Sequence, residues 1–329
     1  MAFKKRYLIG GLWASAAAFV AVKLLLRPRD VEWEKNREAI FNAEYSHFTE
    51  VDGVRVHYQE AGDSDAPPML LIHGFASSNL VWSKVLLGLA AAGFRVIAPD
   101  LLGYGYSSKP RKLDYSIDSQ ARLIVSFLKQ LEIDRAVIVG SSYGGAVAAT
   151  VALDNPDVVE KLILVGAVTN NAPTRYLLMR LFSSPIIGDI VSPLVVSSRR
   201  LLRARMKGVY DRHEWVLDEK RVHARHLPLR TRGTHRAIIR TVRRWDADRV
   251  SRDAHLLAQP TLVLWGDNDR EVPLRDGERL HQEISQSRLV VFRECGHLPH
   301  EEYPTEFIEV VAGFCSGKLP DHEGRLLAT

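Results

Sequence analysis

One serine lies in a sequence pattern that could make it a nucleophile. Residues 140–145 read Gly-Ser-Ser-Tyr-Gly-Gly, so Ser142 has a glycine two positions away on each side, whereas Ser141 has none there. An apolar run precedes this segment and a helical pattern follows it. A nucleophile in a tight turn between a strand and a helix needs small flanking residues, because larger side chains would clash across the bend. The spacing therefore predicts that Ser142 attacks an electrophilic substrate atom.

A serine nucleophile needs a base and a group that orients the base, and candidates for both follow downstream. Two apolar runs, 261–265 and 288–292, are typical of buried strands. The loop after the first run carries Asp267 and Asp269, and the loop after the second carries His297. The histidine is placed to take the serine proton and return it to the leaving group, while one of the carboxylates orients the imidazole.

Hydrogen-bond donors are also needed for the negative charge that develops on a carbonyl oxygen during attack. The apolar run 69–72 ends in His73-Gly74-Phe75, which indicates a strand that breaks into a loop. We expect the backbone N–H groups of Phe75 and of Tyr143, the residue after the nucleophile, to form an oxyanion hole.

Together these segments resemble the α/β-hydrolase superfamily, over residues 45–317. The resemblance includes the segment Asp100-Leu-Leu-Gly-Tyr-Gly-Tyr-Ser and the run from Gly296 to Pro304. It implies an α/β-hydrolase fold, in which helices flank a mostly parallel twisted sheet and an inserted helical cap covers the site.

The family's pattern Gly-x-x-Asp-x-x-Val-Pro implies which aspartate is the acid. It places the acid at Asp269, so we expect Asp267 to cap or tie the loop. The segment from Asp100 matches a structural turn of the family and is expected to belong to the scaffold. The resemblance thus implies a catalytic triad of Ser142, Asp269 and His297.

Within the superfamily, the chain is most similar to serine esterases and monoacylglycerol-lipase-like members with an N-terminal membrane segment. Dehalogenases and epoxide hydrolases of this fold carry an aspartate in place of Ser142. Hydrolases of carbon–carbon bonds usually have a tryptophan directly after the catalytic histidine, where this chain has Leu298. We therefore expect hydrolysis of carboxylic esters, such as acylglycerols or other lipid esters, through an acyl-enzyme. Cleavage of a carbon–carbon or amide bond by the same triad is the alternative. A non-catalytic binding protein with this fold is an alternative of another class.

Length and composition indicate one catalytic domain with an insertion. A chain of 329 residues with 46% hydrophobic content can bury a sizeable core. Short apolar runs alternate with helical patterns, which predicts a mostly parallel sheet, and Asp52-Gly53 predicts a hairpin at its start. The helical patterns lie at 79–91, 116–132, 144–155, 275–285 and 304–315. The expected division is a membrane anchor at 1–29, a linker at 30–44, a core at 45–167 and 256–317, a helical cap at 168–255 and a tail at 318–329.

The expected cap, residues 168–255, shows helical patterns without a strand pattern and would shape the substrate pocket. It carries 19 Lys and Arg against 8 Asp and Glu, a net charge of +11 in a chain whose total is +5. This charge favours an anionic membrane surface or an anionic substrate. No nucleic-acid motif accompanies the charge, so we expect no nucleic-acid partner. Apolar candidates for the inner face of the cap are Tyr176, Leu177, Phe182, Ile186, Ile187, Val191, Leu194 and Val195.

The N-terminal segment predicts a membrane anchor. After Lys4-Lys5-Arg6, residues 7–22 carry no charge, and the apolar run extends to Leu26. This length approaches the ~20 residues that cross a bilayer core. We expect a single-pass signal anchor. Cleavage after the alanine-rich stretch, giving a secreted or periplasmic protein, is the alternative.

The sequence predicts neither a cofactor nor a metal ion. No glycine-rich phosphate loop is present, and Cys295 and Cys315 lack the spacing of metal ligands. The expected partners are a small-molecule or lipid ester and a membrane surface. The oligomeric state is not predicted.

Overall fold

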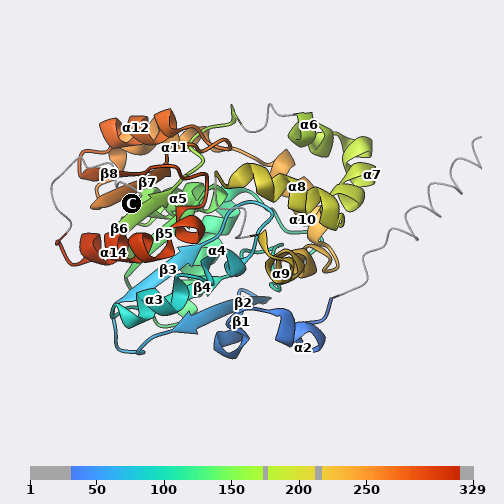
Figure 1. Cartoon of the computed structure of the whole chain (residues 1–329), viewed down its shortest axis with the longest axis horizontal. Coiled ribbons are helices and arrows are strands. Elements are labelled where there is room, and N and C mark those ends of the chain that lie inside the picture. Colours follow the sequence, from blue (N-terminus) through green and yellow to red (C-terminus); the bar gives the residue numbers. More distant parts are fainter. Residues whose placement is uncertain (1–30, 173–176, 212–216, 319–329) are drawn as a thin grey trace, which may run out of the picture.

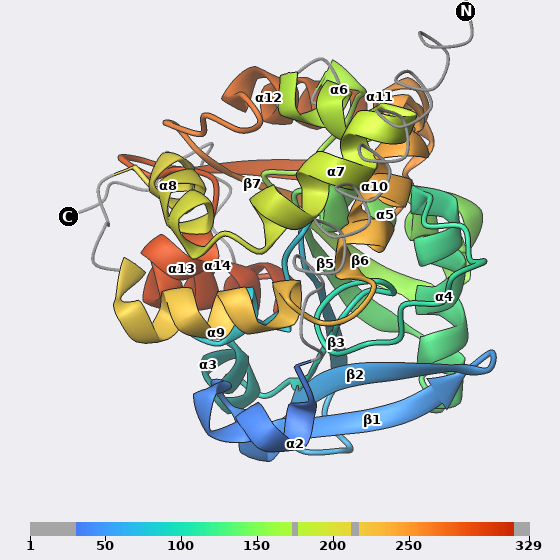
Figure 2. The same cartoon turned by 90° about the vertical axis from the view of Figure 1, so that its right-hand side faces the viewer.

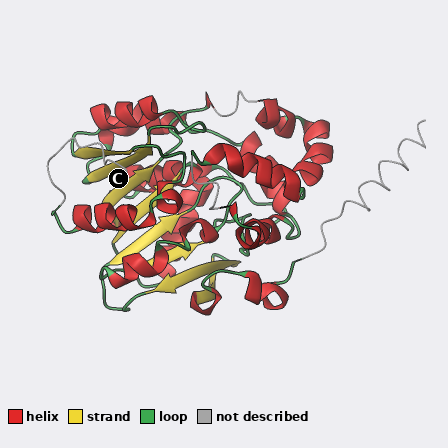
Figure 3. Ribbon diagram, viewed as in Figure 1, coloured by secondary structure: helices red, strands yellow, loops and turns green. Residues whose placement is uncertain are grey.

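The described part of the chain forms an eight-stranded sheet with helices on both faces (Figures 1 and 3). The computed structural model describes residues 31–172, 177–211 and 217–318. The strand order is β1-β2-β4-β3-β5-β6-β7-β8, and β2 pairs antiparallel with β1 and β4 while all other pairs are parallel. The predicted α/β-hydrolase fold is thereby confirmed. The strands are β1 (Ser46–Val51), β2 (Val54–Ala61), β3 (Pro68–Ile72), β4 (Arg95–Pro99), β5 (Ala136–Ser141), β6 (Val159–Val165), β7 (Thr261–Gly266) and β8 (Ser287–Phe292).

Successive side chains of the central strands are apolar on both faces of the sheet, which explains why helices cover both faces. In β3, Leu70 and Ile72 join the core cluster that includes side chains of α4 and α5, whereas Met69 and Leu71 join the cluster that includes α3 and α14. Successive side chains of a strand point to opposite faces, so a strand covered on both sides appears as a continuous apolar run. The helices that contact the sheet include α3 (Leu86–Ala91), α4 (Ile117–Gln130), α5 (Tyr143–Asp154), α12 (Leu274–Glu283) and α14 (Pro304–Cys315).

Helices fill the stretch between β6 and β7. Most of them, α6 to α10, gather beyond one end of the sheet (Figures 1 and 2). The carboxyl ends of β5, β7 and β8 precede the loops that carry the predicted triad. We refer to residues 168–255 as the helical insertion. Its helices are α6 (Leu177–Ser183), α7 (Pro185–Val196), α8 (Arg199–Val209), α9 (Glu219–Leu229), α10 (Thr234–Arg243) and α11 (Asp248–Asp253).

The expected inner face of the insertion is only partly right. Phe182 is buried, and Val195 is packed against the core. Leu177 and Leu194 are instead 71% and 47% exposed, and Ile187 is exposed too. A strongly apolar helix has no clear polar face, so the sequence does not indicate which side turns inward. Tyr176 lies outside the described residues.

The predicted helix at 79–91 is interrupted. The chain forms a 3₁₀ turn at Asn79–Trp82 and begins the helix α3 only at Leu86. The carbonyl oxygen of Ser83 accepts a hydrogen bond from the side-chain amide of Asn42 at 3.1 Å. This distant contact takes a carbonyl that a continuous helix would use internally, and local sequence does not reveal it.

The N-terminal side of the described chain packs on the sheet. The short helix α2 (Trp33–Asn36) places the Trp33 ring 4.7 Å from the ring of His57 and 5.7 Å from that of Phe48. The predicted membrane localisation is corrected here, because no helix within residues 31–172, 177–211 or 217–318 has the length and apolar character needed to cross a bilayer. The expected anchor at 1–29 itself lies outside the described residues, as does nearly all of the tail.

Candidate active site

Ser142 occupies the turn between β5 and α5. Its backbone has φ 56° and ψ −120°, a conformation that residues with side chains rarely adopt. The flanking glycines are required because a larger side chain at either position would clash with the backbone. A Cβ on Gly140 would lie 2.3 Å from the carbonyl oxygen of Gly144, and a Cβ on Gly144 would lie 2.3 Å from that of Ile72. The turn has the strand, strained serine and helix that the Gly-x-Ser-x-Gly spacing predicts.

His297 and Asp269 form a buried, hydrogen-bonded pair. Nδ1 of His297 lies 2.7 Å from Oδ2 of Asp269. The other carboxylate oxygen, Oδ1, accepts hydrogen bonds from the backbone N–H groups of Glu271 and Val272 at 2.8 and 2.9 Å. These contacts hold the carboxylate, and the carboxylate leaves Nε2 of the imidazole for proton transfer.

Asp267 lies on the same loop in a different environment. It is exposed, and its side chain accepts a hydrogen bond from the backbone N–H of Cys295 at 3.3 Å. This bond joins the loop after β7 to the loop after β8. The structure therefore brings Asp269, and not Asp267, to His297.

The surroundings of His297 raise the pKa of its imidazole. Burial lowers this pKa, but the negative charge of Asp269 and the hydrogen bond to it together outweigh burial. Glu271 raises the pKa further and Arg205 lowers it, and the net value is above the usual 6.5. The pair is thus suited to accept a proton from a hydroxyl group during attack.

Two backbone N–H groups beside Ser142 have no acceptor in the described part of the chain. They belong to Phe75 and to Tyr143, the first residue of α5. N–H groups in the first turn of a helix have no partner within the helix. The loop before Phe75 touches the nucleophile, because a Cβ on Gly74 would lie 3.1 Å from Cβ of Ser142. Both predicted oxyanion donors therefore lie near the serine.

Ser142 and His297 line the same cavity, which has a volume of about 490 Å³. No hydrogen bond joins the serine hydroxyl to the imidazole within the described ranges. Such bonds are often long in the absence of substrate. Much of the wall is apolar and comes from the helical insertion, including Leu178, Phe182, Val195, Val196, Leu202, Met206 and Leu229.

Gly166, directly after β6, was not predicted to belong to the site. It has φ +50°, and a Cβ on it would lie 3.0 Å from Nδ1 of His297 and 3.2 Å from Oδ2 of Asp269. A glycine that follows a buried strand is the signal that could have drawn attention to it. Its missing side chain leaves room for the pair.

A buried ion pair beside the cavity was also not predicted. Arg225 of α9 pairs with Glu301 of the short helix α13 (Pro299–Glu302), and the hydroxyl of Tyr210 donates to the same carboxylate. Burial raises the pKa of Glu301, but the positive charge of Arg225, smaller charge effects of His300 and Arg221, and the hydrogen bond from Tyr210 together outweigh burial, so the net pKa is below the usual value. The contact joins the insertion to the loop of the histidine. Only tertiary packing brings these residues together.

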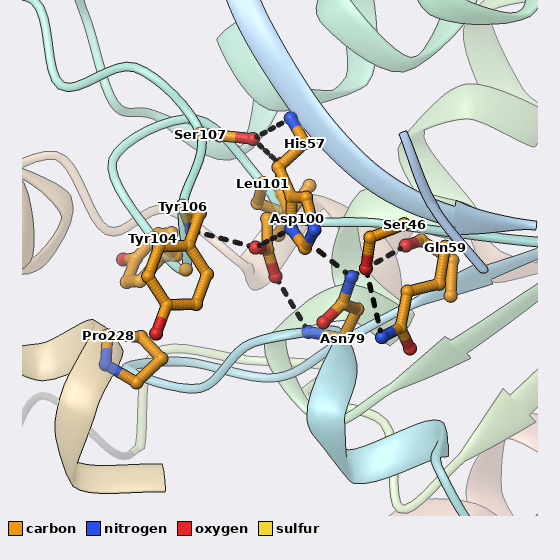
Figure 4. A network of polar contacts seen from close by, with 12 residues as sticks. Ser46, His57, Gln59, Asn79, Asp100, Leu101, Tyr104, Tyr106, Ser107 and Pro228 are labelled. Atoms are coloured by element: carbon orange, nitrogen blue, oxygen red, sulfur yellow. Dashed lines mark hydrogen bonds and ion pairs between the residues drawn. The ribbon is translucent and has the colours of Figure 1, made fainter. Parts of the chain in front are cut away.

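Figure 4 shows a second buried histidine–aspartate pair, His57 and Asp100. Nδ1 of His57 lies 2.7 Å from Oδ2 of Asp100, whose carboxylate also accepts from the backbone N–H groups of Asn79 and Tyr106 at 2.8 Å. Both side chains of the pair are fully buried, and neither residue lines the cavity. The contacts brace the turn after β4, which is the scaffold role expected for this segment.

The charged groups of the cavity suit an anion better than a metal ion. Across the described ranges, no three His, Cys, Asp or Glu side chains are grouped so that they could hold a metal. The charged side chains on the cavity wall are Arg205, Arg225 and Glu271. Guanidinium groups bind carboxylates through paired hydrogen bonds.

This chain belongs to the alpha/beta hydrolase family, whose profile matches residues 69–310. An uncharacterized protein of Mycobacterium tuberculosis is 33% identical, and the match covers 83% of this chain and 82% of that protein. The 2-hydroxymuconate semialdehyde hydrolase of a Pseudomonas species is 29% identical, with 80% and 90% covered. Among solved structures, the meta-cleavage product hydrolase of Pseudomonas fluorescens IP01 has a TM-score of 0.72 and 26% identity, with 84% and 99% covered. The predicted superfamily is confirmed, whereas these similarities do not confirm the esterase or lipase subtype.

Proposed function

We propose that this protein is a serine-dependent hydrolase that cleaves a bond next to a carbonyl group. One observation carries the proposal: a strained serine opens onto the same cavity as a histidine that is held at 2.7 Å by a buried carboxylate. In this scheme His297 accepts the proton of Ser142 while the serine oxygen attacks the carbonyl carbon. Asp269 holds the imidazole, and the N–H groups of Phe75 and Tyr143 stabilise the oxyanion.

We place carbon–carbon bond cleavage first among the reactions. The named relatives, 2-hydroxymuconate semialdehyde hydrolase and meta-cleavage product hydrolase, support this order. After attack, the carbon–carbon bond breaks, its electron pair stays on the leaving carbon, and His297 returns the proton to that carbon. Water, deprotonated by His297, then hydrolyses the acyl ester on Ser142.

The cavity favours a small substrate with an apolar body and a negative charge. Arg225 is neutralised by Glu301, and Arg199 and Arg203 share Glu219. Arg205, in contrast, lines the cavity without an ion-pair partner among the described residues. A guanidinium without an ion-pair partner among the described residues, in a mostly apolar cavity, suits a substrate carboxylate.

Ester hydrolysis is the second candidate, and Leu298 favours it. Leu298 lines the cavity directly after the histidine, where hydrolases of carbon–carbon bonds usually have a tryptophan. The apolar wall also suits the acyl chain of an acylglycerol or a simpler ester. The same serine, histidine and oxyanion donors serve either reaction.

A substrate panel tests the order of these candidates. Purified wild type and Ser142→Ala would be compared on a 2-hydroxy-6-oxo-dienoate, 4-nitrophenyl butyrate and a monoacylglycerol. We expect the largest kcat/KM for the dienoate and loss of all turnover in the variant. Faster turnover of the esters would favour the second candidate, and turnover that survives Ser142→Ala would contradict both.

A further inference from the structure

Three consecutive residues of the helical insertion contact the loops that carry the proposed base and acid. We call Val209, Tyr210 and Asp211 the tether. The carbonyl oxygen of Val209 accepts a hydrogen bond from the backbone N–H of His297 at 2.8 Å. The hydroxyl of Tyr210 donates to the buried carboxylate of Glu301, four residues further along the histidine loop. The tether is thus bonded to the base itself and to its loop.

The side chain of Asp211 contacts the loop after β7, which carries Asp269. Oδ2 of Asp211 accepts a hydrogen bond from the side-chain amide of Asn268 at 2.9 Å, and Oδ1 lies 3.6 Å from a guanidinium nitrogen of Arg270. Asn268 and Arg270 directly precede and follow Asp269 in the chain. The Asp211 side chain is only 9% exposed, whereas its partners Asn268 and Arg270 lie at the surface. One carboxylate therefore contacts both neighbours of the acid.

Asp211 also reaches the histidine loop through its backbone. Its N–H donates to Oε2 of Glu302 at 3.1 Å, and Oε1 of the same carboxylate accepts from the N–H of Gly296 at 2.8 Å. Gly296 directly precedes His297. The approach is close, because a Cβ on Gly296 would lie 2.4 Å from the carbonyl oxygen of Val209. The loops that carry Asp269 and His297 are therefore both hydrogen-bonded to the same short segment of the insertion.

We propose that Asp211 is a positioning residue that sets the distance between Asp269 and His297. The inference rests on the catalytic roles proposed above for these two residues. Their hydrogen bond depends on the relative position of two separate loops, and a displacement of about 1 Å in an active site can lower the rate about 100-fold. Asp211 does not line the cavity, and the contacts given above are with Asn268, Arg270 and Glu302, so its expected effect on the pair runs through the loops.

The test compares the rate of fluorophosphonate labelling of Ser142, from pH 5 to 9, in five full-length proteins, which are wild type and four variants. Asp211→Ala removes the charge and the hydrogen bond to Asn268. Asp211→Asn removes the charge but keeps an oxygen that can accept this bond, and Asp189→Ala removes an exposed aspartate of α7 elsewhere in the insertion. Labelling is normalised to the folded fraction from circular dichroism. Asn268→Ala breaks the same contact from the other side if Asp211→Ala does not fold.

We expect Asp211→Ala and Asn268→Ala to label about 10- to 100-fold more slowly than wild type, and Asp211→Asn to recover most of the rate. The rising limb of the pH profile should also move to lower pH in Asp211→Ala. Labelling requires the neutral form of His297. If Asp269 is held less firmly, it raises the pKa of the imidazole by less, so the neutral form appears at lower pH. Glu271 and Arg205, the other charged groups near the ring, are unchanged in the variant. Loss of folded protein alone would not move this limb.

Equal normalised rates and an unmoved limb in Asp211→Ala and wild type would overturn the positioning role. A shift of the same size in Asp211→Asn would also overturn it, because charge alone would then explain the effect. Absence of labelling in folded wild type would instead remove the proposed catalytic roles on which the inference rests.

Discussion

At the scale of single residues, the site requires a residue without a side chain at position 166. Gly166 has φ +50° and leaves the space that the His297–Asp269 pair occupies. We expect Gly166→Ala to lower kcat at least about 10-fold, because the new methyl group displaces the imidazole or the carboxylate. The backbone conformation should also cost about 1 kcal/mol of unfolding free energy.

Gly93→Ala is the matched control for this substitution. Gly93 has φ +96° but no atom within 4 Å of a Cβ, so only the backbone cost applies. Urea unfolding and steady-state kinetics separate the two effects. Equal kcat values in the two variants would show that Gly166 does not support the pair.

The assignment of the acid can be tested at the same scale. Asp269→Asn should lower kcat/KM by about 10³- to 10⁴-fold, because the amide favours the wrong tautomer of His297. Asp267→Asn should lower kcat/KM by less than about 10-fold, because its side chain contacts a backbone N–H of the neighbouring loop and not the imidazole. Kinetics of the two variants on one substrate decide the matter. Equal or reversed losses would contradict the assignment.

At the scale of elements, a buried ion pair joins α9 of the insertion to α13 beside the histidine. The side chains of Arg225 and Glu301 are 11% and 0% exposed. Arg225→Met should reduce the free energy of unfolding by about 3–5 kcal/mol, because it leaves a buried carboxylate without its partner. Urea unfolding measures the change.

An exposed pair of the same insertion supplies the control. Arg199 and Glu219 lie 2.6 Å apart, and their side chains are 43% and 64% exposed. Arg199→Met should therefore reduce the free energy of unfolding by less than about 1 kcal/mol. If Arg225→Met cost no more than Arg199→Met, the pair with Glu301 would not hold the insertion to the core.

The same elements show what the sequence could and could not predict. Buried parallel strands appear as continuous apolar runs, so β3, β5 and β7 and the loops after them were located correctly. The motif residues at 142, 269 and 297 follow such strands, and their meeting point follows from the parallel sheet. The tether lies at the end of α8 and the Arg225–Glu301 pair joins α9 to α13, and both make contacts between segments far apart in the chain that local sequence does not indicate. Contacts between residues far apart in the chain also broke the helix predicted at 79–91.

At the scale of the whole molecule, positive charge is concentrated in the helical insertion. Residues 168–255 carry 19 basic and 8 acidic residues, although the net charge of the chain is only +5. We expect kcat/KM for a carboxylate-bearing substrate to fall several-fold between 20 and 500 mM salt, because the Debye length shortens from about 20 to about 4 Å. A neutral ester of similar size is the control and should change little. Equal salt dependence for the two substrates would mean that this charge does not attract the substrate.

The catalytic scheme depends above all on whether Ser142 is the nucleophile. Folded wild type and Ser142→Ala would be treated with a fluorophosphonate, and the modified peptide would be identified by mass spectrometry. We expect stoichiometric labelling of the peptide that contains Ser142 and none in the variant. Folded wild type that resists labelling, or a variant that is labelled equally, would contradict this scheme and would favour a binding protein that retains the hydrolase fold.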